Sequence, residues 1–285
     1  RAWEGLGYYS RARNLHKASR MIVEEWGGVW RETALELEAL PGVGRYTAGA
    51  IASFAFDQPA AIVEANTARL FARLMALDSD LAQSASRRQL WSLAERVVPR
   101  VRPGEFNQAL IDLGATVCGA RALCQECPVR NCCRAFEHGL VQRIPRQAVR
   151  PDLTDLFELM LVIRRGSEVL LIQHAEGSRW GGLWGFPMLE RTEEVECSGA
   201  EERRLRREAE ARGCGVEFAR WLPAFGHRVT RFRLHLQPVE LLWQAGEWDA
   251  GVRAEWVPVD ELASRPLSVA GRRVLCLPMI GFGQL

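Results

Sequence analysis

Five of the chain's eight cysteines fall within one short stretch, CGARALCQECPVRNCC, which begins at Cys118. A disulfide framework would spread its cysteines through a small secreted domain. A cluster this tight, in a chain that shows no secretory signal, is instead typical of metal binding. Four thiolates in one loop suit either zinc or an iron–sulfur cluster, and the residues alone do not choose between these metals.

A second candidate site begins at the stretch LPGVGRYTAGA, residues 40–50. Gly42 and Gly44 allow a tight turn that leaves backbone N–H groups bare just before a helix. Such N–H groups and the helix dipole together bind an anion. Because a helical pattern over residues 31–40 leads into the turn, the unit is a helix–hairpin–helix, which can hold a DNA phosphate without reading sequence. An ordinary helix–helix turn is the alternative interpretation.

Glu64 stands twenty residues after Gly44, at the start of another helical pattern. A carboxylate at a helix N-terminus is favoured by the helix dipole, which gives Glu64 a purely structural interpretation. The functional interpretation is a partly buried carboxylate that faces the site made by the hairpin. We expect this second role.

The elements that must position these residues follow from periodicity. Residues 10–135 read as helices separated by Gly and Pro. The pattern then changes: residues 157–175 form two apolar runs around a turn, residues 204–213 form a charged helix, and residues 231–243 alternate like a strand. We therefore predict an all-α domain at 1–135 containing the cysteine cluster 118–133, a polar linker at 136–153, and an α+β domain at 154–285.

Charge and hydropathy limit the partners. The net charge is +2, with an excess of five basic residues in the first 150 positions and of three acidic residues in the rest. A mildly basic first half is compatible with a polyanionic partner. No stretch approaches the roughly 20 apolar residues of a membrane span. We also predict that the protein is cytoplasmic, bacterial and nucleoid-associated. Since the chain opens at Arg1 in what reads as the middle of a motif, we also expect a missing N-terminal segment.

Three stretches carry a resemblance: WEGLGYYSRARNLHKA (3–18), LEALPGVGRYTAGAI (37–51) and FNQALIDLGATVC (106–118). Together with the cysteine run they resemble the helix–hairpin–helix DNA glycosylases, and among these most closely the MutY-type, adenine-specific mismatch glycosylases. The resemblance covers almost all of residues 1–135 in order. It implies a multidomain protein, with an all-α glycosylase domain that carries an Fe–S loop, followed by an α+β Nudix-like domain.

The activity that this resemblance implies is base-excision DNA repair. Adenine mispaired with 8-oxoguanine or guanine would be flipped from the duplex, and its N-glycosidic bond hydrolysed through an oxocarbenium-like sugar that a carboxylate stabilises. The family's catalytic Asp corresponds to Glu64, one methylene longer. Tyr46 stands where bifunctional relatives carry a Schiff-base lysine, so we predict excision without lysine-driven strand cleavage. We expect Tyr46 and Asn66 to line the catalytic pocket, although Tyr46 could instead be a packing residue.

The resemblance also implies a cofactor and contacts with double-stranded DNA. The cofactor would be a [4Fe–4S] cluster on Cys118, Cys124, Cys127 and Cys133. The first spacing is one residue shorter than the family's, so zinc stays the alternative metal and Cys132 the alternative fourth ligand. The DNA contacts would come from an aromatic wedge, from the hairpin, and from a stretch that matches the family's F-S-H lesion motif without its hydroxyl: Tyr8, Gly42, Val43, Gly44, Arg45, Phe225 and His227.

The stretch RWGGLWGFPMLE (179–190) is similar to the Nudix-like C-terminal domain of the same glycosylases. Nudix hydrolases bind divalent metal through paired helical carboxylates, and Ala211 and Arg212 replace that pair here. We therefore predict a domain that recognises the lesion and does not hydrolyse nucleotides. A Nudix phosphohydrolase is one alternative for the whole chain. The other is a non-catalytic DNA-binding relative, because Glu64 replaces Asp and the family's general acid, upstream of WEGLGYY, is absent. We expect a monomer.

Overall fold

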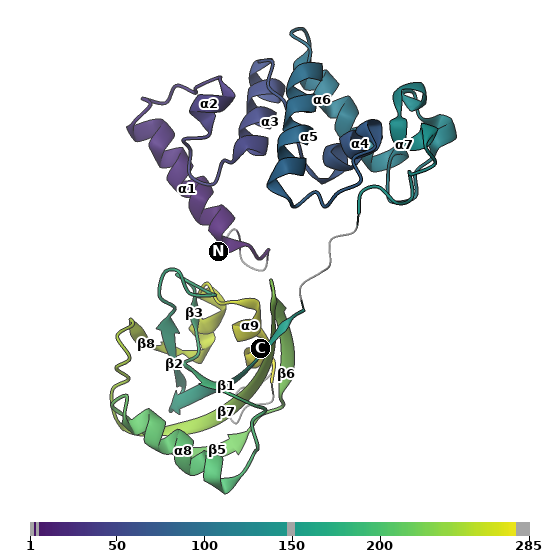
Figure 1. Cartoon of the computed structure of the whole chain (residues 1–285). Coiled ribbons are helices and arrows are strands. Elements are labelled where there is room, and N and C mark those ends of the chain that lie inside the picture. Colours follow the sequence, from purple (N-terminus) through teal and green to yellow (C-terminus); the bar gives the residue numbers. More distant parts are fainter. Residues whose placement is uncertain (1–2, 4–5, 147–151, 278–285) are drawn as a thin grey trace. The chain divides into compact units, whose positions relative to one another are not determined.

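The computed structural model describes residue 3, residues 6–146 and residues 152–277 (Figure 1). It divides into two compact units, one of residues Ser10–Arg150 and the other of Pro151–Leu285 together with Arg1–Tyr9. The second unit thus includes the first nine residues, which the predicted division at 1–135 and 154–285 assigned to the helical domain. Part of the predicted linker, residues 147–151, lies outside the described residues.

The first unit is helical, as the periodicity of residues 10–135 predicts. Thr33 caps α2 by accepting a hydrogen bond from Glu36 N, and Pro103 opens α6 at a position where its missing N–H costs nothing. The elements are α1 (Tyr9–Glu24), α2 (Ala34–Leu37), α3 (Arg45–Phe56), α4 (Ala65–Met75), α5 (Ser84–Val97), α6 (Pro103–Asp112), η1 (Leu113–Val117), η2 (Cys124–Glu126), η3 (Arg130–Cys132) and α7 (Arg134–Glu137).

Close backbone contacts fix α3 against its neighbours. A Cβ on Gly49 of α3 would lie 2.2 Å from the carbonyl oxygen of Ala61, and one on Gly104 of α6 would lie 2.6 Å from that of Ser53. Only glycine therefore fits at these two crossings. Because Ala61 lies three residues before Glu64, the first of them holds the entry to α4 beside α3.

The predicted linker, 136–153, begins inside the first unit. Residues 140–146 follow α7 and fold back on α4, where Ile144 is only 1% exposed. The carbonyl oxygen of Ile144 accepts a hydrogen bond from Arg73 Nε at 2.8 Å. The chain is therefore anchored to the first unit at least as far as this residue.

The second unit is built on one mixed sheet, with strands in the order β3-β2-β1-β7-β5 and β4, β6 and β8 pairing with β1, β7 and β2. The turn predicted within residues 157–175 is confirmed, since Arg165 pairs with Glu168 in the β1–β2 hairpin. The elements are β1 (Thr154–Arg165), β2 (Glu168–Gln173), β3 (Trp184–Gly185), β4 (Met188–Arg191), α8 (Gly199–Glu210), β5 (Cys214–Trp221), β6 (Phe225–Val229), β7 (Phe232–Gly246), β8 (Ala254–Pro258), η4 (Val259–Ser264) and α9 (Val269–Leu275).

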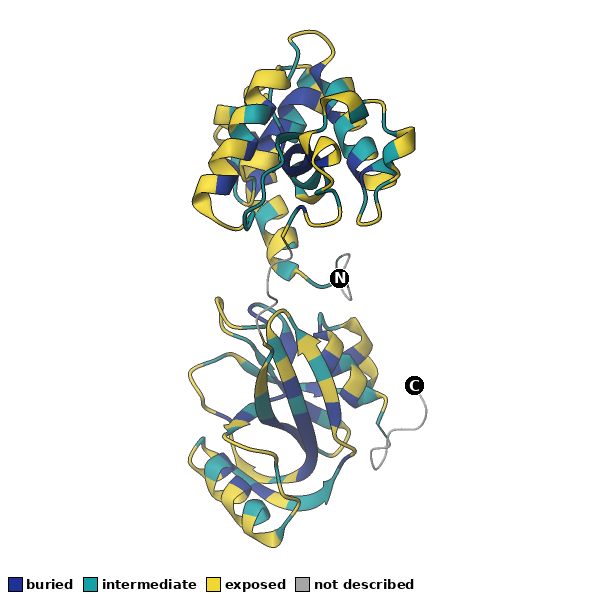
Figure 2. Cartoon of the chain, turned by 45° about the vertical axis from the view of Figure 1, so that its right-hand side comes forward, coloured by how far each residue is buried: buried dark blue, intermediate teal, exposed yellow. Residues whose placement is uncertain are grey.

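Strand β1 divides the core of this unit between the two faces of the sheet. Figure 2 shows buried residues along the strands of this unit. Met160 and Val162 pack in a cluster that includes residues of α9, whereas Leu159 and Leu161 pack in another that includes residues of α8. Successive side chains of a strand point to opposite faces. Helices α8 and α9 therefore cover opposite faces of the sheet.

None of the helices in the described part of the chain combines the length and the apolar character that crossing a bilayer requires.

We expect the second unit to lose stability on mild acidification. His174 follows β2 and packs against Gly185 and Trp180. Burial and, to a smaller extent, the charge of Arg179 lower the pKa of His174 from 6.5 to about 4. Between these pH values the unfolded chain binds more protons than the folded one, so the free energy of unfolding falls as the pH drops from about 6.5 to 4, by up to about 3 kcal/mol.

Urea unfolding of the wild-type protein and of His174→Asn over that pH range measures this contribution. The variant lacks the titrating ring, so its stability should depend less steeply on pH. An equal slope in both proteins would show that His174 does not carry the effect.

Candidate active site and thiol pocket

The glycine turn opens α3 as predicted. Gly42 has φ +79°, a left-handed conformation, and a Cβ there would lie 2.6 Å from the Cβ of Asn14. Val43 N donates to the carbonyl oxygen of Leu40 at 3.0 Å and closes the turn. Gly44 is the N-cap of α3 and has no side chain to cap it. The first N–H groups of α3 have no acceptor within the helix and are available to an anion.

The two residues after Gly44 differ in their surroundings. The guanidinium of Arg45 lies 3.9 Å from the centroid of the Trp91 ring and forms an ion pair with Glu95, both on α5. Tyr46 is 37% exposed on the first turn of α3. Tyr46 is therefore accessible to a ligand at the turn, whereas Arg45 would have to exchange Glu95 for a phosphate.

Glu64 is the N-cap of α4, and its carboxylate folds back on the helix that it starts. Oε1 accepts hydrogen bonds from the backbone N–H groups of Asn66 and Thr67, both at 2.8 Å. The Thr67 hydroxyl accepts from Glu64 N at 2.9 Å, which completes a capping box. Across the described residues no hydrogen bond to Oε2 is formed. One carboxylate oxygen thus holds the helix, and the other is free to face a ligand.

Asn66 is fixed from two sides. Its Oδ1 accepts a hydrogen bond from Arg69 Nη2 at 2.9 Å, and the same nitrogen donates to the carbonyl oxygen of Gly114 at 2.6 Å. A Cβ on Gly114 would lie 2.8 Å from the carbonyl oxygen of Asn66, so η1 packs directly on the start of α4. Sequence reasoning missed Arg69, although its i, i+3 spacing from Asn66 was a usable signal.

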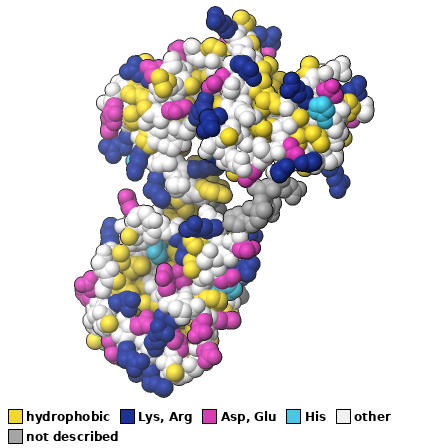
Figure 3. All heavy atoms as spheres, viewed as in Figure 1, with side chains coloured by type: hydrophobic (Ala, Val, Ile, Leu, Met, Phe, Trp, Pro, Cys, Tyr) yellow, Lys and Arg dark blue, Asp and Glu magenta, His cyan; other side chains and the backbone are white. Residues whose placement is uncertain are grey.

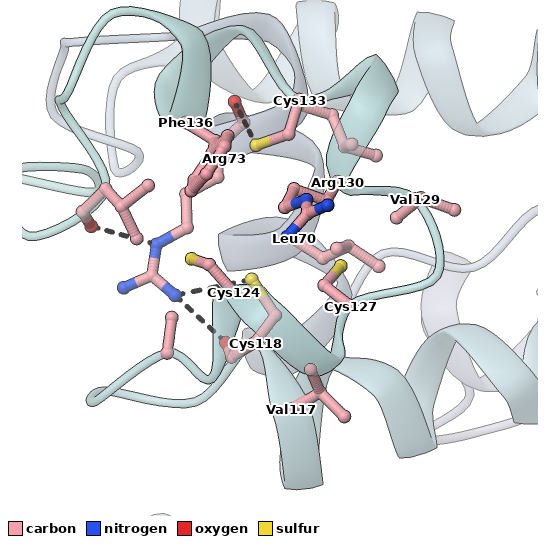
Figure 4. A pocket seen from close by; sticks show the side chains of 13 residues that line it. Leu70, Arg73, Val117, Cys118, Cys124, Cys127, Val129, Arg130, Cys133 and Phe136 are labelled. Carbon is pink, nitrogen blue, oxygen red and sulfur yellow. Dashed lines mark hydrogen bonds between the residues drawn. The ribbon is translucent and has the colours of Figure 1, made fainter.

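Four of the five clustered cysteines line one small pocket, which we call the thiol pocket (Figure 4). They are the four predicted ligands: Cys118, Cys124, Cys127 and Cys133. Cys132 is exposed and does not line this pocket. Burial raises the pKa of the Cys133 thiol, and the neighbouring Cys118 and Cys124 add to this effect. The fold therefore gathers the predicted set with Cys133 as its fourth member.

A buried cation adjoins these thiols. Arg73 of α4 is 3% exposed, and its Nη1 lies 3.3 Å from Cys118 Sγ and 2.8 Å from the carbonyl oxygen of Gly119. Its Nε donates to the carbonyl oxygens of Val141 and Ile144. A guanidinium in this position compensates negative charge on a thiolate. Sequence reasoning missed it because nothing in its local pattern separates it from a solvent-exposed helical arginine.

Comparison with known proteins agrees with both units. Residues 1–96 match the family model of the HhH-GPD superfamily of base excision DNA repair proteins, and residues 159–276 match that of the NUDIX domain. The adenine DNA glycosylase of Mus musculus is 34% identical over 95% of this chain and 62% of its own length. That of Homo sapiens is 37% identical over 65% of this chain and 42% of its own length.

In both units and in its relatives, the chain is similar to the MutY-type adenine DNA glycosylases. It spans less than two thirds of the length of the mouse and human relatives. Among solved structures, that of a thermostable thymine-DNA glycosylase is 32% identical, with a TM-score of 0.40, over 45% of this chain and 59% of that protein.

The residues predicted to contact the lesion or the DNA beside it differ in their exposure. Phe225 is 8% exposed, with Arg273 over its ring at 4.6 Å, so most of its side chain packs in the core of the second unit. His227 is half-buried on β6, and burial, followed by the charges of Arg273 and Arg179, lowers its pKa. Tyr8 is 70% exposed, with φ +45°.

Removing the buried guanidinium beside the thiol pocket should destabilise the first unit. Arg73→Ala leaves several buried carbonyl oxygens without a donor, and we expect the free energy of unfolding to fall by about 3 kcal/mol or more. Urea unfolding followed by circular dichroism measures this change. Arg20→Ala, which breaks an exposed i, i+4 pair with Glu24, is the control and should leave the free energy of unfolding nearly unchanged. Equal losses in the two variants would refute a special role for Arg73.

Proposed function

We propose that this chain carries out base excision in DNA, hydrolysing the N-glycosidic bond of adenine paired with 8-oxoguanine or guanine. The observation that supports it most is a close contact between α3 and the segment that leads into α4. Helix α3 begins at the uncapped Gly44, and a Cβ on Gly49 of this helix would lie 2.2 Å from the carbonyl oxygen of Ala61, three residues before the N-cap carboxylate of α4. An anion site and a carboxylate on adjoining segments suit a nucleotide whose phosphate and sugar must be bound together.

Each group would have a defined task. The first N–H groups of α3 would bind a backbone phosphate next to the extruded nucleotide. Glu64 would place its free Oε2 against the sugar and stabilise the positive charge that develops as the base leaves. Because two backbone N–H groups already hold Oε1, the carboxylate needs little reorganisation during the reaction. Asn66, held by Arg69, would line the same site.

Tyr46 sets the reaction type within this proposal. A phenol has no amine to form an imine with the sugar, so the excised site should remain an intact abasic strand. We expect no covalent protein–DNA adduct when sodium borohydride is added during the reaction.

A duplex with adenine opposite 8-oxoguanine, end-labelled on the adenine strand, tests the proposal. We expect strand cleavage on a denaturing gel only after alkali treatment, and none with a matched thymine-containing duplex. DNA binding without excision would instead support the non-catalytic relative, to which the engagement of Glu64 in the capping box lends some weight. Turnover of nucleoside triphosphates with Mg²⁺ would point to the Nudix alternative.

We further propose that the thiol pocket holds a [4Fe–4S] cluster. No three His, Cys, Asp or Glu side chains in the described residues converge on a point where one metal ion could be held. Tetrahedral zinc would need sulfurs about 3.8 Å apart, whereas a four-iron cluster gives each thiolate its own iron and suits ligands spread around a pocket. The four thiols and the Arg73 guanidinium fit such a group. Its role here would be structural, since it would tie the loop 118–133 to α4.

A further inference from the structure

Two carboxylates of helix α8, in the second unit, are paired with arginines of the same unit. Arg191, at the end of β4, has a side chain only 6% exposed, and it donates from Nε to Glu201 at 2.6 Å and from Nη1 to Glu208 at 3.3 Å. Arg204 Nε donates to the other oxygen of Glu208 at 3.0 Å. These carboxylates are therefore unavailable to the remaining arginines of the helix.

The outward side of α8 carries cations without partners. Leu205 and Ala209 are buried against the sheet, so the opposite side of the helix faces solvent. Arg203, Arg206 and Arg207 are exposed, and in the described part of the chain none of their side chains forms a hydrogen bond or an ion pair. Their i, i+3 and i+4 spacing places them side by side on the helix. We call these three residues the α8 arginine face; Figure 3 shows basic side chains over this end of the unit, with acidic ones beside them.

We propose that the α8 arginine face binds the phosphate backbone of duplex DNA. Neighbouring guanidinium forks match phosphate oxygens in charge and geometry, and contacts of this kind position a protein on DNA without reading sequence. The choice of DNA as the polyanion rests on the proposed function.

The composition of α8 argues against other partners. Within the described residues, the exposed large hydrophobic side chains all lie elsewhere. A helix that lies in a membrane surface needs an apolar face to insert, and a stable protein interface needs apolar or aromatic anchors at its centre. A polyanion with a regular array of charges requires neither.

Binding to an undamaged duplex tests this proposal, because it does not depend on excision. We expect Arg203→Gln/Arg206→Gln/Arg207→Gln to weaken binding of the full chain about 10- to 100-fold near 0.1 M salt, and to make the slope of log K against log salt shallower by up to about 2.7. The matched variant Arg203→Lys/Arg206→Lys/Arg207→Lys keeps the charge and should retain most of the affinity. Glu210 is an exposed carboxylate i+3 from Arg207 and i+4 from Arg206. Glu210→Gln removes a negative charge beside the arginines and should therefore tighten DNA binding.

Unchanged affinity and salt slope in the glutamine variant, with its fold checked by circular dichroism, would overturn the proposal. The proposal would also be overturned if the glutamine variant lost binding to vesicles that contain phosphatidylserine but bound the duplex as the wild type does. Absence of adenine excision, with these binding differences present, would refute the proposed function and leave the α8 arginine face standing.

Discussion

Glu64→Gln is expected to reduce adenine excision by about 10²- to 10³-fold or more while leaving the first unit folded. The amide oxygen of glutamine can still accept hydrogen bonds from Asn66 N and Thr67 N, which now bond to Oε1. The N-cap of α4 is therefore kept, and only the negative charge proposed to face the sugar is lost. Single-turnover rates with excess protein on the duplex containing adenine opposite 8-oxoguanine measure the effect.

Two further variants separate charge from structure. Thr67→Ala breaks the capping box at a cost of about 1 kcal/mol but keeps the carboxylate, so its excision rate should stay close to that of the wild type. Glu64→Asp keeps both charge and cap and places the carboxylate where the MutY-type pattern has it, so it should be at least as active. A Glu64→Gln protein with an excision rate near that of the wild type would exclude Glu64 as the catalytic carboxylate.

Cys133→Ser should remove most of the bound iron and the visible absorption of the cluster, whereas Cys132→Ser should keep both. The two cysteines are adjacent in sequence, but only Cys133 lines the thiol pocket, and Cys132 is exposed. Loss of one of four thiolates also exposes the loop 118–133 to unfolding, because in a closed metal site the binding energy contributes to folding.

Iron analysis and absorption spectra of the two purified variants make a matched comparison. The melting temperature of Cys133→Ser should fall below that of Cys132→Ser. The opposite pattern would move the fourth ligand to Cys132. Zinc in place of iron in the wild-type protein would show that the pocket holds zinc and would refute the [4Fe–4S] cluster.

The local features of this chain could be predicted from its sequence. The turn at Gly42 and Gly44, the helix start at Glu64 and the hairpin before Glu168 all lie where their residues indicate. Turns, caps and periodicity depend on residues a few positions apart, so they are visible in a short window of sequence. The order of an all-α part followed by an α+β part follows from the same signals.

The partners of particular side chains depend on the tertiary structure. Phe225 resembles a contact residue in sequence, but β6 pairs with β7 and turns its ring into the core. Arg73 reads as an ordinary helical arginine, yet it bonds to backbone at Cys118 and Ile144, 45 and 71 positions away. Arg191 likewise donates a hydrogen bond to Glu201 of α8. Burial and long-range bonds arise only when distant segments pack together, and no short window of sequence contains both partners.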